Sequence, residues 1–127
     1  MSEYGKCALD AVKLIRSGHV VYPREAWEIA SSKIFGRGTF SQRKGCPKDA
    51  FLGLCEEGLN KYIPAGSYTK SLKNKQYAID AVSALGKNPD LASNWKALWR
   101  LASRSENKTH YGQMDVVISL WTNGLIE

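Results

Sequence analysis

Apolar residues recur along most of the chain at the three- and four-residue spacing that buries one face of a helix. Ala8, Ala11, Val12 and Ile15 show this pattern near the N-terminus. Glycine, proline and asparagine separate the periodic stretches, as is usual where helices end and begin. The pattern predicts six helices, at about residues 4–17, 23–35, 47–58, 74–86, 89–102 and 111–122. We therefore expect an all-α fold.

The third of these helices has the clearest boundaries. Pro47 suits the first helical position, because its φ is preset and it has no N–H to leave unpaired. Asp49 places a carboxylate at the positive end of the helix dipole. Gly58 can adopt a positive φ and end the helix, so that Leu59 folds back against it.

Two loops flank this helix. The first, 36–45, carries three glycines and three cations. The second, near residues 61–70, has the turn sequence Pro64-Ala65-Gly66 between two short β-prone stretches. We expect it to be irregular or to form a small hairpin, although proline weakens any strand there.

A short repeat divides the chain into two similar parts. The pentapeptide Ala8–Val12 recurs with one change as Ala78–Val82. Each copy precedes a proline-opened helix with a tryptophan, and then a helix that ends in Gly-Leu. These features are Pro23 with Trp27, Pro89 with Trp95, Gly58-Leu59 and Gly124-Leu125. The chain is either two three-helix units, 1–60 and 74–127, joined by a loop at 61–73, or six unrelated helices with common caps.

Size and composition fit one soluble domain over residues 1–127. Apolar residues make up 43% of the chain and charged residues 24%, which is typical of globular proteins. The apolar runs are too short for a membrane span, and the N-terminus lacks the apolar core of a signal peptide. Three cysteines without paired spacing fit a reducing compartment. We expect a cytoplasmic protein with no membrane partner.

The positive charge is concentrated in the middle of the sequence. The net charge is +6, and residues 33–75 hold nine cations against three anions, which accounts for the whole excess. This segment is either a solubilising surface or a site for phosphate or another polyanion. The candidate anion-binding residues are Arg37, Arg43, Lys44, Gly45, Lys48, Lys61, Lys70, Lys73 and Lys75.

The start of the third helix is the most specific anion site that we expect. The N–H groups of Lys48 and Asp49 would point at a ligand in front of Pro47, and Gly45 would let the backbone come close. No nucleotide P-loop pattern is present.

Nucleic acid is one candidate polyanion. A winged-helix docking of the third helix is disfavoured, because Glu56 and Glu57 would face phosphates. The loops 36–48 and 61–75 are better contact surfaces. Their aromatic residues, which could stack on bases or simply anchor the loops, are Phe40, Tyr62 and Tyr68.

A thiol-dependent enzyme is the rival hypothesis. Cys46 at a helix N-terminus beside Arg43 and Lys44 would have a lowered pKa and could act as a nucleophile, with His19 or His110 as base. The alternative is that Cys46 is a cap or a small packed residue. We expect no metal site and no cofactor.

A third hypothesis is a protein-interaction or homo-oligomerisation module, which an exposed patch of Trp95 and Trp99 would favour. The leading hypothesis remains a non-enzymatic module that binds an anionic partner.

Four segments together resemble a family of small, single-domain bacterial proteins of unknown function. They are Pro23–Trp27, Lys44–Leu59, Lys73–Ala78 and Gln113–Val117, of which the second is the most specific. The resemblance covers nearly the whole chain. It implies a self-contained domain and brings no reaction, cofactor or ligand.

Overall fold

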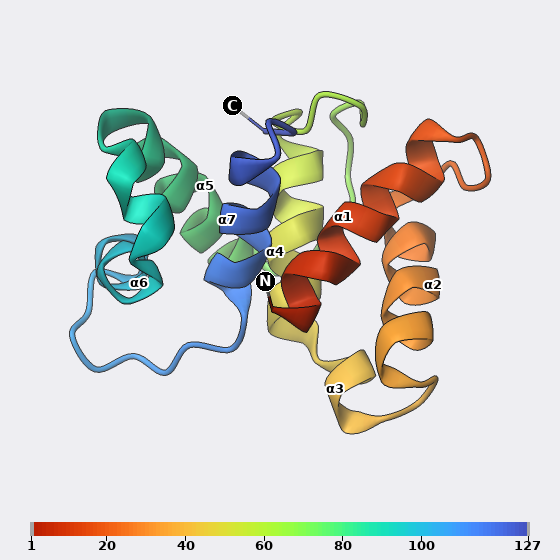
Figure 1. Ribbon diagram of the computed structural model, residues 1–127, viewed down its shortest axis with the longest axis horizontal. Coiled ribbons are helices and arrows are strands. Elements are labelled where there is room, and N and C mark those ends of the chain that lie inside the picture. The colour runs from red at the N-terminus through yellow and green to blue at the C-terminus, as the bar shows by residue number, and fades with distance from the viewer. Residues whose placement is uncertain (1, 127) are drawn as a thin grey trace.

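The computed structural model describes residues 2–126 and shows an all-α fold (Figure 1). Six longer helices and two short ones are present, and the described residues contain no strand. The helices are α1 (Glu3–Arg16), α2 (Pro23–Phe35), α3 (Phe40–Arg43), α4 (Gly45–Glu56), α5 (Leu72–Lys87), the 3₁₀-helix η1 (Pro89–Ser93), α6 (Trp95–Ser103) and α7 (Gln113–Thr122). The predicted fold class is confirmed.

Helices α4 and α7 lie side by side at the centre of the molecule, with α1 and α2 on one side and α5 and α6 on the other (Figure 1). The buried apolar residues of all six longer helices belong to one core cluster. Within the described residues, no helix is both long and apolar enough to cross a membrane.

The helices follow the sequence repeat, because α1, α2 and α4 correspond to α5, α6 and α7. The first helix of each half packs against the third helix of the other half, α1 on α7 and α5 on α4. The two third helices pack against each other. These three contacts are those that a pseudo-two-fold relation between the two predicted units requires.

The ends of α4 and α7 show the correspondence most closely. Gly58 and Gly124 both have positive φ, 75° and 69°. The next residues fold back in the same way: the Leu59 N–H donates to the Leu54 carbonyl and the Leu125 N–H to the Leu120 carbonyl, at 3.1 and 2.9 Å.

A contact between two residues at equivalent positions of the repeat lies beyond these helix ends. Asn60 and Ile126 form an isolated antiparallel bridge. They lie 66 residues apart, as do Gly58 and Gly124. An antiparallel pairing of equivalent positions is what a two-fold relation requires.

The two crossings between the halves each need a residue without a side chain. On α4, a Cβ at Gly53 would lie 2.6 Å from Lys75 Cα of α5. On α1, a Cβ at Gly5 would collide with Ser119 Oγ of α7. In the repeat, Gly5 is equivalent to Lys75, and Gly53 is equivalent to Ser119. The glycine therefore lies on the first helix of a unit in the α1–α7 crossing and on the third helix of a unit in the α5–α4 crossing.

The predicted repeat was wrong in pairing Trp27 with Trp95. Counted from the helix starts, Trp27 in α2 corresponds to Trp99 in α6, and their side chains are 1% and 5% exposed. The error arose because Pro89 opens a separate 3₁₀ turn, η1, and Asn94 then caps α6 by accepting from the Ala97 N–H at 3.2 Å.

Two other helix starts differ from the prediction. Helix α4 begins at Gly45, so Pro47 is its third residue. Helix α5 begins inside the predicted loop 61–73, because the Ser71 hydroxyl accepts from the Asn74 N–H and makes Ser71 the cap. The predicted loop 36–45 also contains α3, which Thr39 caps through the Gln42 N–H.

The hairpin considered near residues 61–70 does not form. The N–H groups of Tyr68 and Thr69 donate instead to Glu56 Oε1, at 2.8 and 3.2 Å, and the Gly66 N–H donates to the Glu56 carbonyl. The Glu56 carboxylate thus accepts from backbone N–H groups that would otherwise pair the strands of a hairpin. The loop is irregular, which was the other conformation predicted for it.

Candidate anion-binding face

Lys75 is neutralised by two carboxylates. Its Nζ lies 2.6 Å from Glu56 Oε2 and 2.7 Å from Glu57 Oε1, and its side chain is only 17% exposed. The Lys75 hydrogen bond is the main reason that the pKa of Glu56 falls to about 2, and the N–H groups of Tyr68 and Thr69 lower it further. The two carboxylates raise the pKa of Lys75. This lysine therefore serves the α4–α5 packing.

Acidic residues of α2 offset three further candidates. Lys48 Nζ lies 3.6 Å from Glu28 Oε1. Arg37 and Arg43 line a hollow that Glu25 and Glu28 also line. These three cations thus lie near carboxylates from a part of the chain that is neutral overall.

Lys61 lies at the other end of the molecule. Its backbone N–H donates to the Leu125 carbonyl at 3.0 Å, beside the bridge that follows the C-terminal ends of α4 and α7. The nine predicted residues therefore do not form one patch.

The start of α4 also differs from the predicted anion pocket. Because the helix begins at Gly45, its first backbone N–H groups are those of Gly45 and Cys46, which precede Pro47 rather than follow it. A Cβ at Gly45 would lie 3.6 Å from Asp49 Oδ2. The helix's own carboxylate thus already lies close to this terminus.

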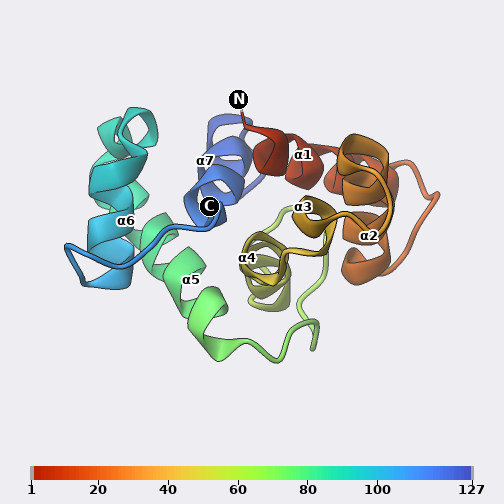
Figure 2. The same ribbon diagram turned by 90° about the horizontal axis from the view of Figure 1, so that it is seen from below.

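Lys44 contacts aromatic rings at the junction of α3 and α4. Its Nζ lies 5.1 Å from the centre of the Tyr111 ring and 5.9 Å from that of Tyr4. Gln113 Nε2 donates to Asn74 Oδ1 at 3.2 Å and so joins the start of α7 to the start of α5. The N-terminal ends of α4, α5 and α7 therefore meet on the side of the molecule that Figure 2 views.

Two more lysines lie on this side. Lys108 Nζ donates to the Tyr77 hydroxyl at 2.8 Å, and this bond raises the pKa of Lys108. Lys73 is close enough to Lys108 to affect that pKa. Trp99 Nε1 fixes the backbone by donating to the Lys108 carbonyl at 2.8 Å. We call Lys44, Lys73, Lys108 and Tyr111 the basic face.

Sequence reasoning missed Lys108. It lies outside residues 33–75, in a part of the chain where acids and bases balance. Only the packing of the 104–112 segment against α5, through Tyr77, brings it beside Lys73. Of the predicted candidates, Lys44 and Lys73 belong to the basic face, and Lys70 is exposed in the segment that leads into α5.

Comparison with known protein families places this geometry in context. The model of a family of unknown function, DUF6979, matches residues 1–127. The chain belongs to the DUF6979 family. The resemblance to a family without an assigned function is thereby confirmed, and DUF6979 membership supplies no reaction, cofactor or ligand. No curated protein and no solved structure matches the chain.

His110 caps a helix in this DUF6979 chain. Its Nε2 accepts from the Met114 N–H at 3.0 Å at the start of α7. The imidazole stacks on Trp95, with 4.6 Å between ring centres, and meets Trp99 edge-on at 5.2 Å. The accepting nitrogen carries no proton, so the capping form of the ring is neutral.

This cap should make stability depend on pH. Burial lowers the pKa of His110, and the Lys44 charge lowers it further, while Asp115 opposes both. The unfolded chain takes up the proton near pH ~6.5, so stability should fall as the pH drops below this value. We expect His110→Gln, which keeps an acceptor but cannot titrate, to remove this dependence in urea unfolding between about pH 7 and 5. His19→Gln is the control, and equal slopes in wild type and His110→Gln would contradict the role.

Cys46 is the second residue of α4 and is half-buried. Both histidines that the enzyme hypothesis needs are engaged elsewhere: His19 Nδ1 lies 2.6 Å from Ser17 Oγ, and His110 caps α7. Burial raises the pKa of Cys7 to about 12. No group of three or more His, Cys, Asp or Glu within residues 2–126 could hold a metal ion. The thiol-dependent enzyme stays a prediction without added support.

Proposed function

We propose that this DUF6979 chain is a non-enzymatic module that binds a polyanion through the basic face, with nucleic acid as the first class to test. The supporting observation is that Lys73 and Lys108 are neighbours and that Lys44 contacts Tyr111, whose N–H donates to Gln113 Oε1. Within the described residues, no ion pair joins any of these three lysines to a carboxylate. A bound phosphate would supply the negative charge that these ammonium groups lack.

The surroundings of these lysines suit a nucleic acid strand. The positive ends of the α4, α5 and α7 dipoles lie on the same side and add to the potential. Tyr111 is 45% exposed, and Phe40, which opens α3, is 83% exposed. Exposed aromatic rings beside cations provide stacking surfaces for unpaired bases. Of the other aromatic candidates, Tyr62 lies under Arg16, and the Tyr68 hydroxyl bonds the Pro64 carbonyl.

Salt dependence tests this proposal. We expect fluorescence anisotropy to show binding of a labelled single-stranded oligonucleotide at about 50 mM salt, weakening towards about 200 mM with a log–log slope of roughly −2 for three phosphate contacts. The double variant Lys73→Glu/Lys108→Glu should weaken binding by about tenfold or more and reduce the slope. A duplex of the same sequence tells whether unpaired bases matter.

The matched control carries the same charge change away from the basic face. Lys13→Glu/Lys87→Glu alters exposed lysines at the C-terminal ends of α1 and α5 and should keep most of the affinity. Two results would contradict the proposal: no binding at low salt, or the same loss in both double variants, which would indicate an effect of net charge alone.

A further inference from the structure

The connector between the two halves occupies a groove on α4. Glu56 Oε1 accepts from the N–H groups of Tyr68 and Thr69, and the Thr69 hydroxyl donates to Asp49 Oδ1 at 3.0 Å. From the opposite side, Arg24 in the first turn of α2 donates to the Tyr68 carbonyl at 3.1 Å. An extended segment is thus held through its backbone and one hydroxyl.

The correspondence between the two predicted units gives this groove a counterpart on α7. Asp115 corresponds to Asp49, and Thr122 and Asn123 correspond to Glu56 and Glu57. Counted from the helix starts, Lys96 of α6 corresponds to Arg24 of α2. The recognition elements around the connector therefore have polar counterparts in the second half.

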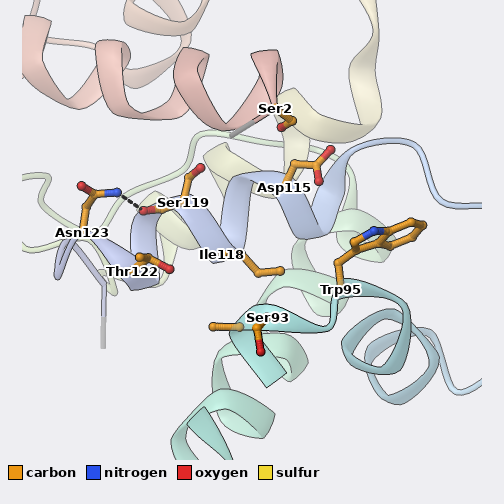
Figure 3. Close-up of a pocket in the computed structure, with 9 residues that line it drawn as sticks. Ser2, Ser93, Trp95, Asp115, Ile118, Ser119, Thr122 and Asn123 are labelled. Carbon is orange, nitrogen blue, oxygen red and sulfur yellow. Dashed lines mark hydrogen bonds between the residues drawn. The ribbon is translucent and has the colours of Figure 1, made fainter. Parts of the chain in front are cut away.

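The counterpart is a hollow of about 300 Å³ between the start of α1, α7 and the η1–α6 junction (Figure 3). We call it the α7 hollow. Its lining residues are Ser2, Ala92, Ser93, Trp95, Asp115, Ile118, Ser119, Thr122 and Asn123. Where the connector covers α4, the corresponding face of α7 is thus an open space between described residues.

The polar groups of the α7 hollow are a carboxylate, an amide, four hydroxyls and an indole N–H. Asn123 Nδ2 donates to the Ser119 carbonyl at 2.8 Å, which leaves Asn123 Oδ1 as an acceptor. The Asp115 carboxylate lies at the other end of the same face of α7 (Figure 3). Ile118 and the indole of Trp95, which is 41% exposed, supply apolar surface. A ligand that donates hydrogen bonds to Asp115 and covers apolar carbon therefore fits this lining.

We infer that the α7 hollow binds an extended peptide segment of a partner protein, as the α4 groove binds the connector. Backbone N–H groups of the segment would donate to Thr122 and Asn123, and a serine or threonine side chain would donate to Asp115. Lys96 Nζ lies 5.8 Å from the Trp95 ring centre, beside the hollow, where it can donate to a peptide carbonyl as Arg24 does. This lysine disfavours a small cation, the other class of ligand that a carboxylate next to an indole attracts.

The first probe is the acetylated and amidated tetrapeptide Ser-Tyr-Thr-Lys, the sequence of residues 67–70. We expect it to cause saturable NMR shifts at the amides of Asp115 and Thr122 and at the Trp95 indole, with Kd of about 1 mM. Thr122→Glu places a carboxylate in the α7 hollow at the position that corresponds to Glu56 on α4. It should tighten binding about fivefold, because a charged acceptor strengthens the hydrogen bonds to the peptide N–H groups.

A double-mutant cycle tests the assigned contact with Asp115. Asp115→Asn and a peptide with valine in place of threonine should each weaken binding about threefold, and together they should cost no more than either alone. Thr109→Glu adds the same charge outside the hollow and should leave the affinity unchanged. Dispersed NMR spectra of every variant establish that each one is folded.

Three results would overturn the inference. The first is the lack of saturable shifts with both wild type and Thr122→Glu at peptide concentrations of about 10 mM, well above the expected Kd. The second is a set of shifts centred outside the α7 hollow. The third is an equal gain in Thr122→Glu and Thr109→Glu, which would show that the peptide responds only to net charge.

Discussion

Alanine in place of Gly53 is expected to destabilise the protein by about 3 kcal/mol, at the upper end of the range for overpacking. The new Cβ would lie 2.6 Å from Lys75 Cα and 2.7 Å from its Cβ. The first of these atoms is backbone, so no rotamer change relieves the clash and α4 must move away from α5. Urea unfolding followed by circular dichroism measures the loss.

Gly86 is the matched control, because it also lies inside a helix, in α5, but has no atom within 4 Å of a Cβ. Gly86→Ala should be neutral or stabilise the protein by up to about 1 kcal/mol, as alanine favours helix. If Gly53→Ala were as mild as Gly86→Ala, the close α4–α5 crossing would be incorrect.

The second crossing offers a rescue that follows from the pseudo-symmetry. Gly5→Ala should cost about 2 kcal/mol, because its Cβ meets Ser119 Oγ and lies 3.1 Å from the Asp115 carbonyl. Adding Ser119→Gly moves the glycine to α7, which is the arrangement that Gly53 has on α4. The double variant should recover about half of the loss, despite the helix cost of a glycine.

Glu56→Gln is expected to destabilise the protein by about 2–3 kcal/mol. One carboxylate oxygen accepts from two backbone N–H groups and the other from Lys75, whereas an amide has only one accepting oxygen. The side chains of Glu56 and Lys75 are 12% and 17% exposed, so solvent replaces the lost partners poorly. Urea unfolding again gives the change in free energy.

The same substitution should alter acid denaturation. The pKa of Glu56 is about 2 in the folded chain and lies below its ordinary value of 4.5. Stability from this carboxylate is therefore complete above about pH 4.5 and is lost as the pH falls towards 2. Glu56→Gln should flatten this limb, while Glu57→Gln, whose side chain is 46% exposed, should largely keep it. Equal behaviour of the two variants would refute the role of Glu56.

The sequence predicts the helices well because their apolar spacing is a property of each segment alone. The starts of the helices were harder to predict, because neighbouring residues compete as caps. We expected helices to begin at Pro89 and Asn74, but Asn94 and Ser71 act as the caps. The sequence around Asn94 and Ser71 gives no stronger capping signal than the sequence around Pro89 and Asn74. The sequence pattern indicates a repeat. It does not indicate that the first helix of each unit packs on the third helix of the other, because that is a tertiary contact that no local pattern encodes.

The candidate site depended on partners that lie far apart in sequence. Counting charges placed Lys75 in a basic segment, yet Glu56, 19 residues earlier, neutralises it. The same count missed Lys108, since its neighbour Lys73 lies 35 residues away. Net charge over a segment thus indicates where cations are common but not which of them have a carboxylate partner.

The packing of α1 on α7 has a consequence for synthesis on the ribosome. Helix α1 packs partly on α2, which follows it directly, but the rest of its apolar face is covered by α7, about one hundred residues later in the chain. Until α7 leaves the exit tunnel, this part of the face stays open to water or to chaperones. Contacts between such distant segments slow folding.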